Sequence, residues 1–215
     1  MSRPARRLSP WLAIGAAIVL AGCGGILSEP PQRKLYQLKA PVSFTAPQRH
    51  SSAQLLLALP NAPAGLDTER IALSRSPMSL DYFADAQWTD RAPLLVQTAL
   101  LDGFEKSGAV PAVGRDGAGL RADFILETDL RDFAANYDSP SGPPRIAVAF
   151  NVKLIKIPER KIIGVKSVTR QQPAAADTIP EIVRAFDAAL GGAVEEAVRW
   201  AVAQPALSSA RASLF

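Results

Sequence analysis

The feature that most constrains the fold is a set of three neighbouring segments, 123–133, 146–157 and 161–169, in which apolar and polar residues alternate. The middle segment is the clearest, because every second residue from Ile146 to Leu154 is apolar and the residues between them are small or polar. Alternation with a period of two places the apolar side chains on one face of a strand. The pattern predicts an antiparallel meander with one apolar face and one partly solvated face.

Short apolar segments bounded by proline, glycine or polar residues predict further strands. They lie at 34–39, 54–59, 70–74, 80–88 and 109–113. The run at 54–59 ends at Pro60 and has the continuous apolar character of a strand that is buried on both faces. We therefore expect the meander to belong to a larger sheet.

Helical spacing of apolar residues predicts a first helix over 89–107. Thr89 or Asp90 is a candidate cap for its first turn. Pro93 falls in that turn, and Gly108 is expected to end the helix. The side chains that we expect to face the core are Leu94, Leu95, Thr98, Leu101 and Phe104.

A second, longer amphipathic helix is predicted over 178–203. Thr178 and Glu181 have the spacing of a capping box, and Pro205 follows the helix. Gly191-Gly192 interrupts it, which indicates either a close approach to the sheet or a bend. The expected core stripe is Ile182, Val183, Phe186, Leu190, Ala193, Val194, Ala197 and Ala201.

Residues that could carry catalysis or bind a metal are scarce. His50 is the one histidine and Cys23 the one cysteine, so a zinc site or a histidine-based catalytic site has no partners. Glu127 and Asp129 share a strand face, where charges ordinarily discourage edge pairing. The glycines of 114–119 lack the lysine and capped helix of a phosphate loop, which favours a solvent turn. We assign no catalytic, metal or small-molecule residue and expect no enzyme.

Aromatic residues before the first helix offer a weak alternative. Tyr82, Phe83 and Trp88 could contact a ligand, but aromatics in this position are more often core or interface residues. Trp200, near the end of the second helix, is a candidate contact residue if it lies off the apolar stripe. The sequence leaves its place open.

The N-terminus has the anatomy of a targeting segment. Three arginines precede an apolar run at 11–21, and Leu20-Ala21-Gly22-Cys23 resembles the lipobox of bacterial lipoproteins. The run is too short to cross a membrane, which takes roughly 20 apolar residues. A plain secretory signal would leave a free thiol without evident use, and the residues around Arg6-Arg7 fit twin-arginine export poorly.

We therefore expect residues 1–22 to be a lipoprotein signal peptide, and Cys23 to carry a diacylglycerol and an N-acyl chain as its only prosthetic groups. Residues 23–33 would form a tether, 34–204 the folded domain and 205–215 a flexible tail. Removing residues 1–22, which hold three arginines and no acid, lowers the formal charge from +4 to +1. A chain so nearly neutral gives no support to nucleic-acid binding.

Three segments in a fixed order complete the pattern: Leu35-Tyr36-Gln37-Leu38, then 65–73 (GLDTERIAL) and 80–88 (LDYFADAQW). With the lipobox and the two helices, the chain resembles the ABC-type transport auxiliary lipoproteins, the PqiC-like family. The resemblance implies an α/β fold: a single domain in which a mixed β-sheet with an antiparallel meander packs against helices, similar to the N-terminal domain of TolB. It also implies a non-enzymatic role.

The same resemblance implies partners. Such lipoproteins accompany an ABC permease, its ATPase and an MCE-domain periplasmic protein that move lipids between membranes and support membrane integrity. Gly24, in the place where an aspartate would retain a lipoprotein in the inner membrane, favours a periplasmic domain anchored in the inner leaflet of the outer membrane. The sequence does not determine whether the protein forms a homo-oligomer, such as a ring.

Two other functions remain as alternatives. A lipoprotein that itself carries lipid in an apolar cavity would show a similar pattern of apolar residues between sheet and helices. A periplasmic hydrolase is disfavoured by the shortage of histidine and the missing nucleophile motifs.

Overall fold

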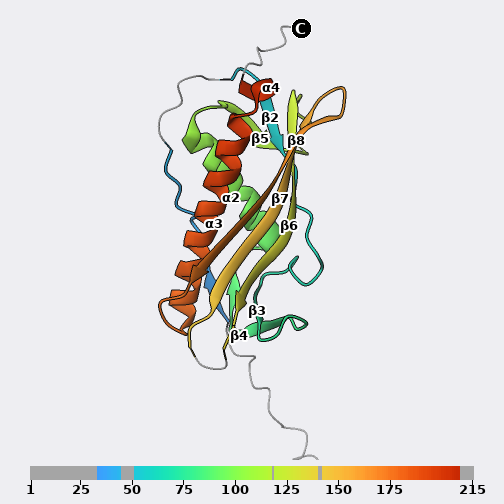
Figure 1. Ribbon diagram of the computed structural model, residues 1–215. Coiled ribbons are helices and arrows are strands. Elements are labelled where there is room, and N and C mark those ends of the chain that lie inside the picture. The colour runs from blue at the N-terminus through green and yellow to red at the C-terminus, as the bar shows by residue number, and fades with distance from the viewer. Residues whose placement is uncertain (1–32, 45–50, 118, 140–141, 209–215) are drawn as a thin grey trace, which may run out of the picture. The chain divides into compact units, whose positions relative to one another are not determined.

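The computed structural model describes residues 33–44, 51–117, 119–139 and 142–208 (Figure 1). The chain divides into two compact units, Met1–Gln32 and Arg33–Phe215, and all of the described residues belong to the second. Within the described ranges, none of the helices combines the length and apolarity that crossing a bilayer requires.

Apart from α4, which was not predicted, the elements follow one another in the order expected, with shifted ends. They are β1 (Lys34–Tyr36), β2 (Gln54–Leu57), β3 (Arg70–Ser74), β4 (Asp81–Trp88), α2 (Ala92–Ser107), β5 (Ala112–Arg115), β6 (Phe124–Asn136), β7 (Arg145–Lys156), β8 (Lys161–Pro173), α3 (Ile179–Val202) and α4 (Pro205–Ser208). The strand expected at 109–113 begins three residues later, and β8 runs four residues beyond the predicted end.

The predicted meander is confirmed. β6 pairs antiparallel with β7 from Phe124↔Lys156 to Asn136↔Arg145, and β7 pairs antiparallel with β8 along its whole length. The expected inward residues of β6, Phe124, Leu126 and Leu130, are all buried. The alternation therefore identified both the strands and their inner face.

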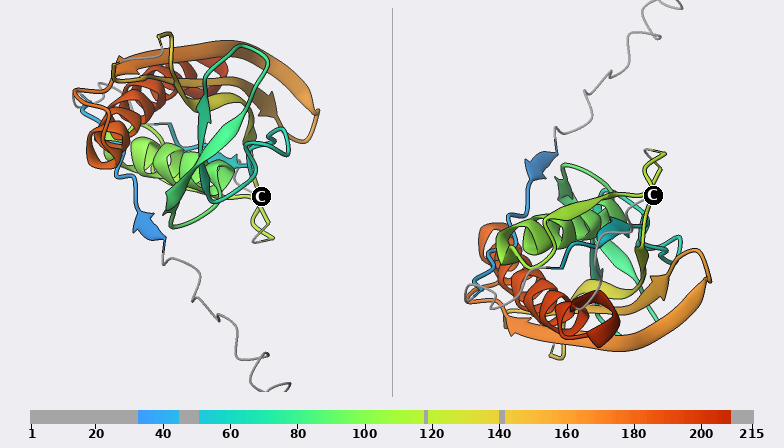
Figure 2. Two further views of the ribbon diagram at one scale, coloured as in Figure 1. Left: turned by 90° about the horizontal axis from the view of Figure 1, so that it is seen from below. Right: turned by 90° about the horizontal axis from the view of Figure 1, so that it is seen from above.

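Parallel pairings extend the meander into a mixed sheet. The second edge of β6 is shared by two strands, because β2 pairs parallel with its start and β3 pairs parallel with its end. β5 lies parallel to β2, β4 antiparallel to β3, and β1 parallel to β4. The sheet curls around α2 and α3 (Figures 1 and 2). The predicted α/β class with a mixed sheet is confirmed.

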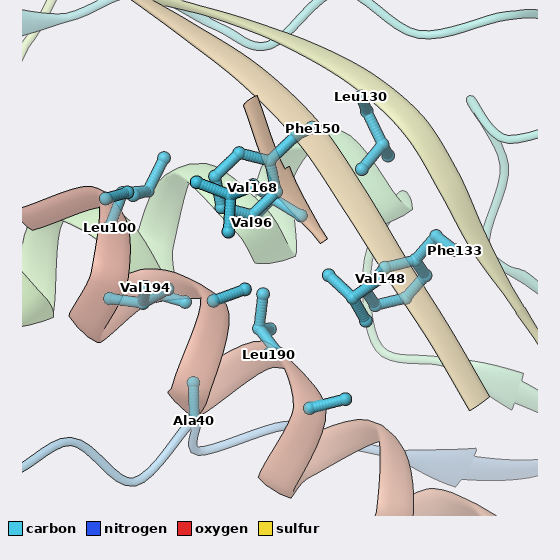
Figure 3. Close-up of a cluster of buried hydrophobic side chains, with 14 of the residues drawn as sticks. Ala40, Val96, Leu100, Leu130, Phe133, Val148, Phe150, Val168, Leu190 and Val194 are labelled. Atoms are coloured by element: carbon cyan, nitrogen blue, oxygen red, sulfur yellow. The ribbon is translucent and has the colours of Figure 1, made fainter. Parts of the chain in front are cut away.

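The core fills the space between the curled sheet and the two long helices. Figure 3 shows Val148 and Phe150 of β7 directed towards Leu190 and Val194 of α3. These four side chains are at most 1% exposed. Burial of this kind is the dominant stabilising contribution to a domain of this size.

Three aromatic rings close one part of this core. Trp88 stands edge-on to Phe133 and Phe186, with ring centroids 5.9 and 5.1 Å away, and the two phenylalanine rings are 5.0 Å apart. They come from β4, β6 and α3, so the cluster joins three distant parts of the chain. Trp88 is thus a core residue, which confirms the interpretation that the sequence favoured over ligand contact.

The predicted cap of α2 is wrong, whereas the predicted cap of α3 is the right residue but lacks the expected side-chain bond. The residue before α2 is Arg91, not Thr89 or Asp90, and it makes no side-chain capping bond. Thr178 does precede α3, but it too makes no capping bond. Each helix instead begins with a proline in its first turn, where a missing N–H costs nothing.

The predicted inner face of α2 is also wrong, except for Phe104. Leu94, Leu95 and Leu101 are half-buried and Thr98 is exposed. The buried face consists largely of smaller side chains: Ala92, Pro93, Val96, Gln97, Ala99, Leu100, Gly103, Phe104 and Ser107. On α3 the predicted stripe is confirmed, with Val183 alone half-buried.

The predicted tail is wrong in its first residues. Pro205–Ser208 forms α4, and Leu207 is fully buried. The Ser51 hydroxyl donates a hydrogen bond of 2.6 Å to the Leu207 carbonyl and ties α4 to the start of the sheet. Residues 209–215 lie outside the described ranges.

Candidate functional site

The predicted lipid-attachment residue, Cys23, lies outside the described residues, as does His50. The chain is described from Arg33 onwards, ten residues after the cysteine. The segment that leads from there into the core is the described part of any connection between an anchor and the domain.

The chain enters the domain as an edge strand. β1 lies beside the end of β4, with Leu35 opposite Gln87 and Tyr36 opposite Trp88. The backbone N–H of Thr89 donates a hydrogen bond of 3.0 Å to the Tyr36 carbonyl. The first described residues are thus fixed to the sheet directly beside the buried Trp88.

Residues 37–44, the entry segment, then run along α3 and are held there by carboxylates. One oxygen of Asp187 accepts the backbone N–H groups of Lys39 and Ala40, at 2.6 and 2.7 Å. A carboxylate oxygen of Glu195 accepts the N–H of Ser43 at 2.7 Å. Hydrogen bonds to charged acceptors are stronger than neutral ones, so both contacts favour this path.

Gly191 lies between the two carboxylates and permits the close approach. A Cβ atom there would stand 2.4 Å from the carbonyl oxygen of Pro41, and an approach that short does not occur. Asp187, Gly191 and Glu195 are four residues apart, so they share one face of α3. Ala40, at a positive φ of 44°, is buried against the core.

The binding of the entry segment to α3 was not predicted from the sequence. We expected the glycine pair to approach the sheet or to bend the helix, yet Gly191 approaches the entry segment while Gly192 faces Arg170 of β8. The signal that could have found it was the Asp-Gly-Glu spacing of four residues along α3.

The carboxylates of β6 hold the sheet together. Asp129 accepts a hydrogen bond of 3.0 Å from Lys153 of β7 and lies 3.8 Å from Arg131. The bond from Lys153 keeps the pKa of Asp129 below its usual value. A carboxylate held ionised by a lysine is unsuited to act as a general acid with Glu127. Asp129 thus has a structural role, but not the expected one of guarding an edge, because β6 is paired along both of its edges.

The other sequence candidates also have structural roles. The glycine-rich stretch forms the end of β5 and a turn, and the next element is the strand β6 rather than a helix. The Tyr82 hydroxyl donates to the Gly65 carbonyl at 3.0 Å, beneath the guanidinium of Arg70. Trp200 is half-buried and packs where β8 has Gly164.

Tyr137 joins two connections at the end of the domain that holds β3 and β4. Its hydroxyl donates a hydrogen bond of 2.6 Å to Asp177, which precedes α3. Burial, together with that bond, raises the pKa of Tyr137 to about 12. The phenol is therefore neutral at physiological pH and serves as a fixed donor.

The space between the sheet and helices holds side chains. The residues of its core cluster are all at most 7% exposed. Two of the clefts among the described residues lie at the margins of the sheet, and a third lies between the entry segment and α2. The largest of these, of about 650 Å³, includes charged residues such as Asp116 and Arg121 in its lining. Among the described residues, no three metal-ligating side chains gather in one place.

Comparison with known proteins gives a consistent assignment. Residues 36–198 match the family described as ABC-type transport auxiliary lipoprotein component. The chain is 30% identical over 179 residues to an uncharacterised protein of Bradyrhizobium diazoefficiens, which covers 80% of this chain and 46% of that protein. The chain therefore spans about half the length of this relative.

Solved structures agree on the fold. A crystal structure of a protein from Xanthomonas campestris is similar with a TM-score of 0.71 and 28% identity, covering 78% of this chain and 94% of that one. A crystal structure of an uncharacterised protein gives a TM-score of 0.62 at 13% identity, covering 79% and 99% of the two chains. The second likeness, at that identity, shows the fold alone.

Proposed function

Because the chain belongs to the family of ABC-type transport auxiliary lipoprotein components, we propose that it is a lipid-anchored, non-enzymatic docking component of a lipid transport system that supports membrane integrity. The observation that carries the proposal is the family match, which covers most of the folded domain. The anchor is the diacylglycerol and N-acyl chain on Cys23. Acyl chains contribute roughly 0.8 kcal/mol per buried CH₂, so several of them hold a protein firmly to a bilayer.

The domain acts by binding protein rather than by carrying lipid. A carrier needs an apolar cavity large enough for an acyl chain, whereas the space between sheet and helices is filled by side chains such as Trp88, Phe133 and Phe186. Of the two carboxylates that could have formed a catalytic pair, Asp129 is engaged by Lys153. These observations favour a docking role over the two alternatives.

The partners we propose are an MCE-domain periplasmic protein and the ABC permease and ATPase that work with it. Lipid must cross water between two membranes, and a domain tethered in one leaflet can hold a periplasmic conduit against it. Gly24 after the cysteine supports a location in the inner leaflet of the outer membrane. Assembly into a homo-oligomer would multiply the contacts with such a conduit.

The entry segment supports this arrangement. Because Asp187 and Glu195 hold residues 39–43 on α3, the described end of the connection to the proposed anchor is fixed to the core of the domain. A docking protein needs such a connection to keep a partner at a defined place on a membrane.

The test is purification of the lipidated protein from membranes in mild detergent, followed by mass spectrometry of the proteins that accompany it. We expect an MCE-domain protein, a permease and an ATPase. The matched control is Cys23→Ala, which should leave a folded domain that no longer partitions with membranes. Recovery of the wild-type chain alone, with stoichiometric lipid, would contradict the docking role and favour the carrier.

A further inference from the structure

The tip of the β3–β4 hairpin, residues 75–80, presents an apolar side chain with no cover in the domain. Met78 is 98% exposed and Leu80 is 42% exposed. Methionine is flexible and apolar, and it suits soft, variable surfaces such as a lipid interface. A side chain this exposed contributes nothing to the core and is free to contact something outside the chain.

The tip is held in place although it projects. The N–H of Ser79 donates to the Ser76 carbonyl at 3.1 Å, and the Ser74 hydroxyl donates to the same carbonyl at 2.7 Å. At the base, the N–H of Tyr137 donates to the Ser74 carbonyl at 2.8 Å, and the Arg75 guanidinium lies 4.5 Å from the centre of the Tyr137 ring. A surface ordered before it binds loses less entropy on contact.

The hairpin lies at the end of the domain where the chain enters. β1 pairs parallel with the last three residues of β4, Ala86–Trp88, so its first residue, Lys34, is the one that lies nearest to the tip. Figure 2, left, looks onto this end, where the hairpin crosses in front of the helices and β1 lies beside the end of β4. In Figure 1 the β3 and β4 labels stand at the lower end, and those of β2, β5 and α4 at the upper end.

Leu35 of β1 is a second apolar residue at this end, and it is 62% exposed. Arg33 comes ten residues after Cys23, a length of chain that spans at most about 35 Å when fully extended. The lipid on Cys23 therefore limits how far Arg33 can lie from the bilayer that holds it.

The region carries both basic and acidic side chains: Asp132 lines one cleft with Met78, and Asp138 lines another with Arg75. Arg75 is the one charged residue in the tip, and Arg33 and Lys34 begin the entry into β1. Asp81, directly after the tip, is the acid nearest to it in sequence. Basic side chains beside exposed apolar ones are the combination that binds at the headgroup region of a membrane.

We propose that the hairpin tip is a second membrane contact, in which Met78 enters the interface of the bilayer that holds the lipid on Cys23. Arg75 lies beside the headgroup phosphates. The inference rests on the proposed lipid anchoring. Because the anchor already confines the domain to the surface, a contact too weak to bind a membrane by itself is sufficient to fix the orientation of the domain.

The occupant is the bilayer rather than a partner protein, and a labelled cysteine distinguishes the two. Met78→Cys in the full, lipidated chain gives one reactive thiol, because the thiol of Cys23 is acylated. The label is an environment-sensitive fluorophore, and the protein is reconstituted in vesicles of phosphatidylethanolamine and phosphatidylglycerol. The matched control is Val165→Cys on β8, which is 55% exposed and follows Gly164, the residue that lies beside Trp200 near the end of α3.

We expect the label at position 78 to emit at shorter wavelength in vesicles than in the unlipidated Cys23→Ala background in buffer. Brominated acyl chains should quench it at least twofold more than the label at position 165. Equal quenching at the two positions, or none at position 78, would overturn the inference. A shift of the emission at position 78 to shorter wavelength that appears only after membrane proteins are added would also overturn the inference, because the occupant would then be a partner protein.

Intact mass of the reconstituted protein separates this result from failure of the proposed function. A chain without lipid on Cys23 contradicts the anchor itself. A lipidated chain whose position 78 is not quenched leaves the anchor and the docking role in place and removes only the second contact.

Discussion

The two long helices differ in that the sequence predicted the buried face of α3 correctly but not that of α2. Both α2 and α3 have a stripe of larger apolar residues at helical spacing. On α3 that stripe is the buried face, with Phe186 and Leu190 fully buried. On α2 most of the stripe lies at the edge of the buried face, with Leu94 half-buried. The same pattern thus describes a core face in one helix and a border in the other.

The difference teaches how a neighbouring helix selects a face. A Cβ atom on Gly103 of α2 would lie 2.5 Å from a methyl group of Val194 on α3. The two backbones therefore approach each other at a glycine, which a row of leucines would prevent. Where a close helix pair forms, the small side chains decide which face is buried, and apolar periodicity alone misplaces it.

The largest expected effect tests this comparison with two identical truncations. Leu190→Ala on α3 should lower the free energy of unfolding by about 2–5 kcal/mol, because it leaves a cavity in a core with no free space. Leu94→Ala on α2 should cost less than about 1 kcal/mol, because its side chain is half in solvent. Urea titration followed by tryptophan fluorescence measures both, and equal costs would show that the two stripes are equivalent.

The glycine contact gives the next effect. Gly103→Ala should destabilise the domain by about 2 kcal/mol, because the new methyl group meets a stiff, buried valine and overpacks the helix pair. Gly192→Ala is the control, since its Cβ would stand 3.5 Å from the nearest atom of Arg170, an ordinary contact. That variant should gain about 0.5–1 kcal/mol from helix propensity. A stabilised Gly103→Ala would show that the helices do not depend on this approach.

The contacts between α3 and the entry segment can be removed without changing the core stripe of the helix. Asp187→Ala removes the acceptor of the Lys39 and Ala40 amides and should cost about 1.5 kcal/mol. Hydrogen exchange of those two amides should quicken, while exchange in the β6–β8 meander should stay slow. Glu181→Ala, which removes a surface ion pair with Arg184, should leave the exchange of the two amides and of the meander unchanged. Unaltered exchange at residues 39 and 40 would mean that other contacts hold the entry segment.

The smallest expected effect concerns the outer face of the meander. The pKa of Asp129 is lower in the folded chain than in the unfolded one, so its ion pair with Lys153 stabilises the fold above the unfolded pKa. That contribution is lost as the pH falls through the folded pKa. Lys153→Met should therefore cost about 0.5 kcal/mol at pH 7 and nothing at pH 2. Urea titrations at the two pH values check it, and a pH-independent difference would assign the effect to packing instead.

Alternation and periodicity in the sequence sufficed for most elements. Strand alternation placed Phe124, Leu126 and Leu130 inside, because a residue in a sheet has only two faces to choose between. Proline and glycine at helix ends also carried reliable information, since Gly108 adopts the left-handed conformation, with φ of 63°, that ends α2. The N-terminal signal for lipid attachment at Cys23 stays a prediction from the sequence.

Only the tertiary structure decided how the elements meet. Nothing local to β6 indicates that β2 and β3 divide its second edge, because parallel pairings join segments far apart in the chain. The entry segment is held by Asp187 and Glu195, roughly 150 residues away in sequence. Neighbouring residues determine local conformation, whereas the partner of a small residue or a carboxylate is fixed only when distant parts of the chain pack together.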